Sequence, residues 1–148
     1  MVVSDLDGNR CAQAAATYGA TVAAPEEIHA QHVDVFVPAA LGAVLNDATI
    51  PCLRCRVVCG GANNQLAEAR HDAALAVRGI VFVPDYLANA GVIDFHQETI
   101  DDQPAAVLAS VARIGAITRG VLRCAAATGA TPLSVADDIV RARIIRRA

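Results

Sequence analysis

Polar residues at the ends of apolar runs are the groups in this sequence best placed for chemistry. The run Val2-Val3-Ser4 ends at Asp5, and a run over residues 56–59 passes through two glycines into Asn63 and Asn64. A carboxylate at the end of a parallel strand can accept hydrogen bonds from sugar hydroxyls, and asparagine amides can bind polar ligands at the same edge of a sheet. The sequence therefore predicts a small-molecule site built from strand ends.

Asp5 has the position of the acid that holds the adenosine ribose in a Rossmann-type domain. Such a carboxylate favours NAD, because it repels the 2′-phosphate of NADP. The acid normally follows the start of a Gly-rich phosphate loop by about 20 residues. No G-x-G-x-x-G occurs in these 148 residues, so we expect that loop to precede residue 1.

A second interpretation of the same residues is a phosphatase. Asp5-Leu6-Asp7-Gly8 is similar to the D-x-D-G motif of haloacid-dehalogenase-type phosphatases, in which the first Asp is the nucleophile and the second the general acid beside Mg²⁺. That motif usually continues with Thr, whereas Asn9 follows here. Those enzymes also use a downstream basic residue, usually lysine, and this sequence has none. We therefore keep the phosphatase as the less favoured alternative.

Short apolar runs alternate with helical patterns along the chain, which is typical of a parallel sheet in an α/β fold. Strands are predicted over residues 2–4, 21–23, 33–37, 56–59 and 80–83, the third of them buried. Helices are predicted over residues 9–18, 66–78 and 104–128, followed by a last helix that begins with a capping box of Ser134 and Asp137. Residues 85–93 are expected to be irregular.

Composition excludes several classes of function. Hydrophobic residues make up 55% of the chain and the net charge is −3, which does not favour nucleic-acid binding. No apolar run approaches the roughly 20 residues of a membrane span, and the start does not resemble a signal peptide. We therefore expect a soluble, cytoplasmic protein. Its five cysteines should be free thiols, and Cys52-x-x-Cys55 has no second pair that would favour a metal site.

Longer motifs resemble one family. Residues 34–47 are similar to the D-x-x-x-P-C-A-L-G-G-x-x-N-D stretch of leucine, valine and phenylalanine dehydrogenases, with Ala39 and Ala43 in place of its Cys and second Gly. Further matching segments fall at the family's spacing, namely residues 61–66, 70–71, 79–81, 84–86, 89–93, 135–137 and 143–144. The resemblance covers nearly the whole chain and implies the C-terminal NAD-binding domain of the Glu/Leu/Phe/Val amino-acid dehydrogenase family, truncated at its N-terminus.

The resemblance also implies the roles of individual residues. NAD would be bound by Asp5, by the small-residue turn Ala39, Ala40, Leu41 and Gly42, and by Asn63 and Asn89. The amino acid or 2-oxo acid substrate would be bound by Asn64 and by an apolar wall of Val92 and Ile93, which disfavours glutamate. One glycine of the family's N-A-G-G loop is missing after Ala90. The family's substrate-binding and catalytic lysines lie in its N-terminal domain.

We therefore predict an α/β fold: an incomplete Rossmann-type parallel sheet flanked by helices over residues 1–93, with two C-terminal helices over 101–148. Together they would form a partial NAD-binding domain. The implied parent activity is NAD-dependent oxidative deamination of an aliphatic or aromatic L-amino acid, in an enzyme that forms homo-oligomers. The chain alone is expected to be inactive and marginally stable or self-associating. The alternative is a non-catalytic fragment that binds nucleotide weakly or not at all.

Overall fold

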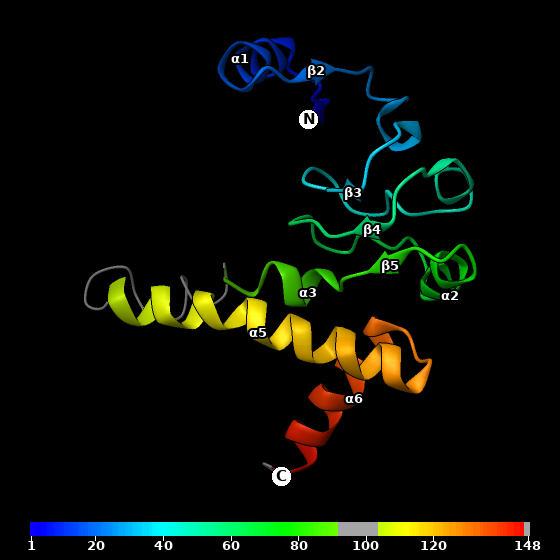
Figure 1. Ribbon diagram of the computed structural model, residues 1–148, viewed down its shortest axis with the longest axis vertical. Coiled ribbons are helices and arrows are strands. Elements are labelled where there is room, and N and C mark those ends of the chain that lie inside the picture. Colours follow the sequence, from blue (N-terminus) through cyan, green and yellow to red (C-terminus); the bar gives the residue numbers. More distant parts are fainter. Residues whose placement is uncertain (92–103, 147–148) are drawn as a thin grey trace.

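The computed structural model describes residues 1–91 and 104–146 of the chain (Figure 1). The strands are β1 (Val2–Val3), β2 (Thr21–Val22), β3 (Val35–Phe36), β4 (Val57–Val58) and β5 (Val81–Phe82). The helices are α1 (Gly8–Tyr18), η1 (Ile28–Ala30), η2 (Ile50–Cys52), α2 (Arg70–Val77), α3 (Asp85–Ala88), α5 (Pro104–Thr128) and α6 (Pro132–Ile145). Strands and helices alternate over the first 91 residues, which confirms the predicted α/β class.

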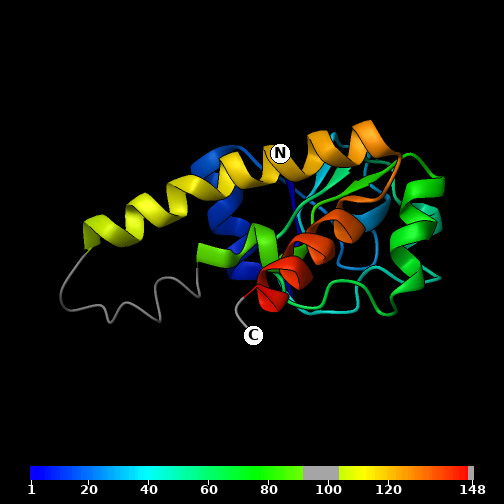
Figure 2. The same ribbon diagram turned by 90° about the horizontal axis from the view of Figure 1, so that it is seen from below.

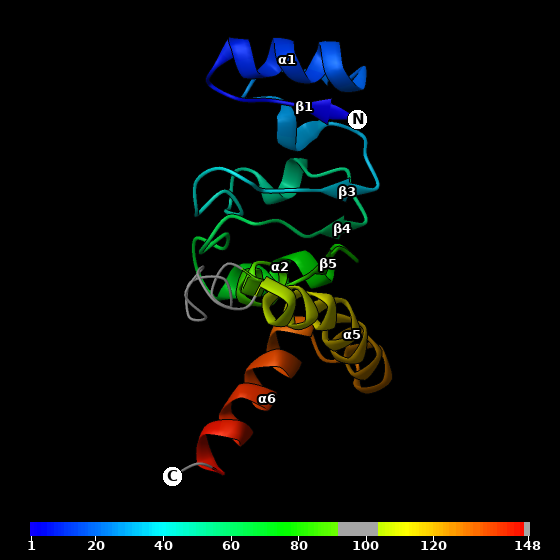
Figure 3. The same cartoon turned by 90° about the vertical axis from the view of Figure 1, so that its left-hand side faces the viewer.

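The strands form two parallel sheets instead of one. β1 pairs with β2, and β3, β4 and β5 form a second sheet in that order. Figure 3 shows that the segment after β1 and the loops after β3 and β4 lie at the same end of the molecule. The carboxyl ends of both sheets therefore share one edge, where α/β proteins place their ligand sites.

Helix α1 has a well-defined start and end. The Asp7 side chain accepts a hydrogen bond from the Asn9 N–H at 2.9 Å, and Gly19, with φ of +63°, ends the helix. Aspartate and glycine are residue types favoured at these two positions, and the helix matches the one predicted over residues 9–18. Tyr18, in the last turn of α1, is 72% exposed. The two-stranded sheet beside α1 is too narrow to cover that end of the helix.

The core is built on the two faces of the β3–β5 sheet, since successive strand residues point to opposite faces. One face packs against η2 and α2, and its buried residues are Phe36, Leu45, Ile50, Leu53, Val58, Leu75, Ile80 and Phe82. The other face packs against α5 and α6 through Val83, Leu87, Val121, Ala125, Val135 and Ala136. Only Cys11 and Ala20 are buried among the apolar residues of α1, β1 and β2 and the turn before β2.

Three predicted elements differ from the structure. Residues 33–37 were predicted to form a buried strand, but β3 covers only two residues, and Val35 is 46% exposed because β1 does not pair with it. Residues 85–88 form the short helix α3 where irregular chain was expected. Helix α6 is capped by Thr131, which accepts the Ser134 N–H at 3.2 Å, so Ser134 is not the cap.

The C-terminal helices complete the fold. Helix α5 runs along the β5 side of the molecule and α6 packs against both α5 and β5 (Figure 2). The hydroxyl of Thr131 also donates to the Asp72 carboxylate of α2 at 2.5 Å, so the cap joins α6 to the sheet layer. Within the described ranges, no helix is long and apolar enough to cross a membrane.

Candidate functional site at the carboxyl ends of the strands

Asp5 lies just past the end of β1 and its carboxylate is accessible. Its Oδ1 atom accepts the Asp7 N–H at 2.9 Å, while Oδ2 lies 3.8 Å from the Arg10 guanidinium. The side chain is 42% exposed. A hollow of about 520 Å³ opens beside it, between the start of α1 and the chain after β2, lined by Asp5, Leu6, Gly8, Cys11, Ala12, Val22, Ala23, Ala24 and Pro25. The site therefore offers an acceptor beside a largely apolar surface.

The turn after β3 is held against the loop after β4. Ala43 has a φ of +58° and donates its N–H to the Asn64 carbonyl at 2.7 Å. At Gly42 a β-carbon would lie 2.7 Å from the carbonyl oxygen of Asn63 and 2.8 Å from that of Asn64. Only glycine permits this approach. Ala39, Ala40 and Leu41 are largely exposed and present the backbone of the turn at the edge of the sheet.

The three predicted asparagines do converge. Asn89, the residue after α3, donates from Nδ2 to Asn63 Oδ1 at 2.5 Å and lies 3.4 Å from the Gly61 carbonyl. Asn64, with φ of +51°, donates its backbone N–H to Asp85 Oδ2 at 2.5 Å. The loop after β4 is therefore tied to both ends of α3.

Gln65 is a supporting residue that sequence reasoning missed. Its side chain is buried, with 1% of the residue exposed, and its Nε2 atom donates to the carbonyls of Gly60 and Ala62 at 2.8 and 2.9 Å. These bonds fold the loop back on itself directly before the asparagines. A glutamine after two asparagines gives no periodic signal, so only its position in the family-like segment 61–66 could have indicated a role.

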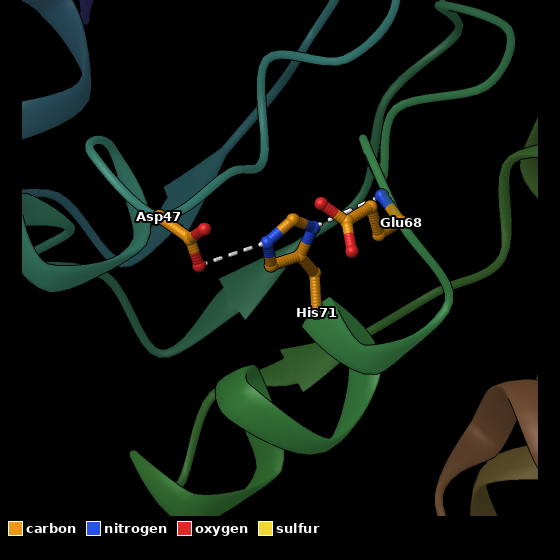
Figure 4. Close-up of side chains that lie close together, drawn as sticks. All are labelled: Asp47, Glu68 and His71. Carbon is orange, nitrogen blue, oxygen red and sulfur yellow. Dashed lines mark hydrogen bonds and ion pairs between the residues drawn. The ribbon is translucent and has the colours of Figure 1, made fainter.

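A second cluster, also missed, joins the turn after β3 to α2 (Figure 4). The buried His71 accepts the Glu68 N–H on Nδ1 at 3.0 Å, and its Nε2 lies 3.2 Å from Asp47 Oδ1. Arg70 pairs with Asp47 at 2.5 Å and with Glu68 at 2.8 Å. The hydrogen bonds from Arg70, and then from His71, lower the pKa of Asp47 to about 2. The cluster therefore contains an ionised carboxylate at neutral pH.

Asp47, Glu68 and His71 are close enough to one another to be considered as metal ligands. Their hydrogen bonds argue against that role. Because Nδ1 of His71 is an acceptor, the ring proton is on Nε2 and points to Asp47, so neither nitrogen has a lone pair free for a metal. The Arg70 guanidinium is already paired with both carboxylates. We interpret the cluster as a structural clamp on the turn that carries residues 39–42.

All five cysteines are free thiols, as predicted, and burial raises the pKa of the Cys55 and Cys59 thiols. A raised pKa keeps a thiol protonated and less nucleophilic.

Most of the predicted site residues therefore lie at the shared edge, in two groups. Asp5 belongs to the β1–β2 sheet, while residues 39–42, Asn63, Asn64 and Asn89 belong to the β3–β5 sheet. No hydrogen bond joins Asp5 to the asparagines within the described part of the chain. Val92 and Ile93 lie outside the described residues.

The described geometry defines an α/β domain of the Rossmann type with polar loops at one edge. A family model for Glutamate/Leucine/Phenylalanine/Valine dehydrogenase matches residues 5–98. Leucine dehydrogenase of Bacillus subtilis is 35% identical over 147 residues, which cover 99% of this chain and 40% of that protein. The chain therefore belongs to the glutamate/leucine/phenylalanine/valine dehydrogenase family.

The chain is also similar to a relative that is named for another amino acid, tryptophan. L-tryptophan dehydrogenase of Nostoc punctiforme is 44% identical over 102 residues, or 68% of this chain and 29% of that protein. Its crystal structure matches with a TM-score of 0.91 at 35% identity, covering 99% of this chain and 46% of that chain. This chain thus spans less than half the length of these relatives.

Proposed function

We propose that this chain provides the NAD-binding and nicotinamide-positioning half of an enzyme that oxidatively deaminates an aliphatic or aromatic L-amino acid to its 2-oxo acid. The observation that carries the proposal is the Asn63–Asn89 hydrogen bond at 2.5 Å, formed by the loop after β4, which lies at the same end of the molecule as the segment after β1 (Figure 3). Two asparagines that fix each other's orientation, one after a strand and one after a short helix, are suited to holding a polar ligand in one pose. Family membership and the leucine and tryptophan dehydrogenase relatives support this chemistry.

The residues present fit the ribose portion of NAD. Among the residues that the structure describes, Asp5 Oδ2 has only the Arg10 guanidinium, 3.8 Å away, as a partner and can accept a ribose hydroxyl, while the hollow beside it can take an adenine ring. NAD⁺, when bound, would accept the hydride from the substrate Cα. Residues 39–42 would place their backbone amides beside the dinucleotide, and Asn63 and Asn89 would orient the nicotinamide ribose.

Asn64 is assigned to the substrate carboxylate in this proposal. Its backbone N–H is already used by Asp85, so the side-chain amide remains for the ligand. The sequence has no lysine, and proton transfer at the substrate amine requires a general base within hydrogen-bond reach. We therefore propose that the 148-residue chain binds nucleotide but does not turn over substrate.

The test is a titration of the chain into NADH, followed by fluorescence, with NADPH as the matched competitor. Binding of NADH that is tighter than binding of NADPH supports the proposal. Leucine-, tryptophan- and phenylalanine-dependent NADH formation is measured in parallel, and we expect none from this chain. No NADH binding at millimolar nucleotide would contradict the proposal and leave the alternative of a fragment without nucleotide affinity.

The phosphatase alternative is not favoured by the local geometry. Asp7, which would be its general acid, caps α1 through the Asn9 N–H, and Asp5 accepts the Asp7 N–H. The Asp7 carboxylate is thus already engaged in capping α1. Mg²⁺-dependent hydrolysis of p-nitrophenyl phosphate that disappears in Asp5→Asn would restore this alternative.

The proposal of an amino-acid dehydrogenase also includes the oligomeric state. In it, the complete enzyme forms homo-oligomers.

A further inference from the structure

Helix α3, which is followed directly by Asn89, is too short to hold its own position. It has four residues, Asp85–Ala88. A single helical turn is unfavourable by itself, because ordering its residues is not compensated by so few hydrogen bonds. The orientation of α3, and with it the direction in which the Asn89 side chain points, must therefore be set by contacts with other elements.

Two of these contacts join α3 to the loop after β4. Asp85 Oδ2 accepts the Asn64 N–H at 2.5 Å, and Asn89 Nδ2 donates to Asn63 Oδ1 at 2.5 Å. Because both partners belong to a loop, these bonds keep α3 and the loop together. The rotation of α3 relative to the rest of the fold depends on the contacts on its other side.

The contacts on the other side come from the two C-terminal helices. Helix α3 lies against α5 (Figure 1), and its Leu87 is buried in the core cluster that also contains Val121 of α5 and Val135 of α6. Burial of apolar surface has no preferred direction. It therefore holds α3 against the two helices without fixing its rotation, whereas a hydrogen bond, which is directional, can do so.

Tyr86 provides the directional contact. Its hydroxyl donates to Asp137 Oδ1 of α6 at 2.7 Å, across 51 residues of sequence. Burial, and then the hydrogen bond to Asp137, raise the pKa of Tyr86, so the phenol remains a donor at neutral pH. Within the described ranges, no other hydrogen bond joins α3 to α5 or α6.

Asp137 belongs to a helix that is itself fixed to the sheet. The residues before it, Val135 and Ala136, are buried in the same cluster. At the start of α6 the Thr131 hydroxyl donates to Asp72 of α2 at 2.5 Å. Asp137 was predicted to belong to a capping box, but Thr131 caps this helix and the Asp137 carboxylate accepts its hydrogen bond from α3.

We propose that Tyr86 and Asp137 are positioning residues through which α6 sets the orientation of Asn89, and thereby the affinity of the site for the nicotinamide side of NAD. Because Asp85, Tyr86 and Asn89 belong to one short segment, a rotation of α3 displaces all three together. Neither Tyr86 nor Asp137 needs to contact the nucleotide. The consequence for binding rests on the proposed function, whereas the link from Asp137 to Asn89 is a property of the chain alone.

The first test contains no nucleotide and follows hydrogen exchange of the Asn64 and Asn89 backbone N–H groups by NMR. These groups donate to Asp85 Oδ2 and to the Asp85 carbonyl, so they report the position of α3. Tyr86→Phe keeps the ring and removes the hydroxyl, and exchange at both groups should become about three- to tenfold faster. Tyr18→Phe, at a residue that is 72% exposed, is the matched control and should leave both rates unchanged.

NADH titration of a second set of variants separates positioning from a general loss of stability. Thr131→Ala removes the cap of α6 and its bond to Asp72, which lowers the free energy of unfolding, but it leaves the Tyr86–Asp137 pair in place. NADH affinity should be kept in Thr131→Ala and should fall about three- to tenfold in Tyr86→Phe and in Asp137→Ala. Asp137→Asn retains an oxygen that can accept from the hydroxyl and should recover part of this loss.

Unchanged exchange at Asn64 and Asn89 in Tyr86→Phe would overturn the proposal. Equal losses of NADH affinity in Thr131→Ala and Tyr86→Phe would also overturn it, because the effect would then follow the stability of α6. Asp137→Ala repeats both measurements from the other partner of the bond. If the unmodified chain binds no NADH, the proposed function fails, whereas the exchange measurement still decides whether α6 orients α3.

Discussion

Asn89 donates a hydrogen bond from Nδ2 to Asn63 Oδ1 at 2.5 Å, across 26 residues of sequence. One asparagine follows α3 and the other follows β4 through two glycines. Their bond, with the Asn64–Asp85 bond beside it, makes the loop and the short helix a single unit. A ligand that contacts one asparagine should therefore respond to a change in the other.

The first prediction follows from this coupling. Asn63→Ala and Asn89→Ala should each weaken NADH binding, and the double variant should lose less than the sum, because each single change already breaks the shared bond. The coupling free energy in the double-mutant cycle should be about 1 kcal/mol. NADH titration of the four proteins measures it, and strictly additive losses would mean that the two residues act independently.

Asp5→Asn should weaken NADH binding by about tenfold or more, since a hydrogen bond to a charged acceptor contributes more than a neutral one. The discrimination against NADPH should fall with it, because the charge that repels the 2′-phosphate is gone. Asp7→Asn is the matched control, as asparagine is an equally good N-cap. If both variants lose NADH affinity alike, the effect belongs to the α1 turn and not to ribose binding.

Gly42→Ala should destabilise the site, because the added β-carbon would lie 2.7 and 2.8 Å from two backbone carbonyl oxygens. Backbone cannot rotate away as a side chain can, so the cost to the free energy of unfolding should be about 1–3 kcal/mol. Gly61→Ala is the control, since a β-carbon there meets nothing within 4 Å. Urea unfolding of both variants measures the difference, and equal losses would contradict the close approach.

The free energy of unfolding should depend on pH in acid, because Asp47 is held in the clamp with Arg70 and His71. The pKa of Asp47 is lowered from 3.8 to about 2 in the folded chain. Its contribution is therefore fully present above pH 3.8 and is lost as the pH falls through about 2. Asp47→Asn should flatten this part of the stability–pH curve, whereas Glu26→Gln, a change at an exposed acid, should leave the curve unchanged. Unfolding midpoints in urea over this range test the sign.

Local sequence patterns predicted much of the fold correctly. Helix α1, the long helix α5 and the α/β alternation all depend on neighbouring residues, which the sequence shows directly. The candidate site residues at the strand ends came from the same patterns and from the resemblance to the family. Helix α3 was missed because four residues give no helical period.

Clusters that join distant segments could not be predicted in this way. Asp47 and His71 are 24 residues apart, and nothing in either neighbourhood indicates that the buried ring reaches that carboxylate. The exposed edge at Val35 was missed for a similar reason. Its valine-rich run is typical of a strand covered on both sides, whether or not a neighbour is paired with it.

The sequence by itself determined that strands and helices alternate, that the strands are parallel, where α1 and α5 lie, and which polar residues follow the strands. These depend on interactions within a few residues. Only the tertiary structure decided that Asn63 and Asn89 bond to each other, that Asp47, Glu68 and His71 form a clamp, and that β1 and β3 belong to separate sheets. Such relationships depend on how whole elements pack, because a hydrogen bond between distant residues requires the complete backbone path to bring its two atoms together.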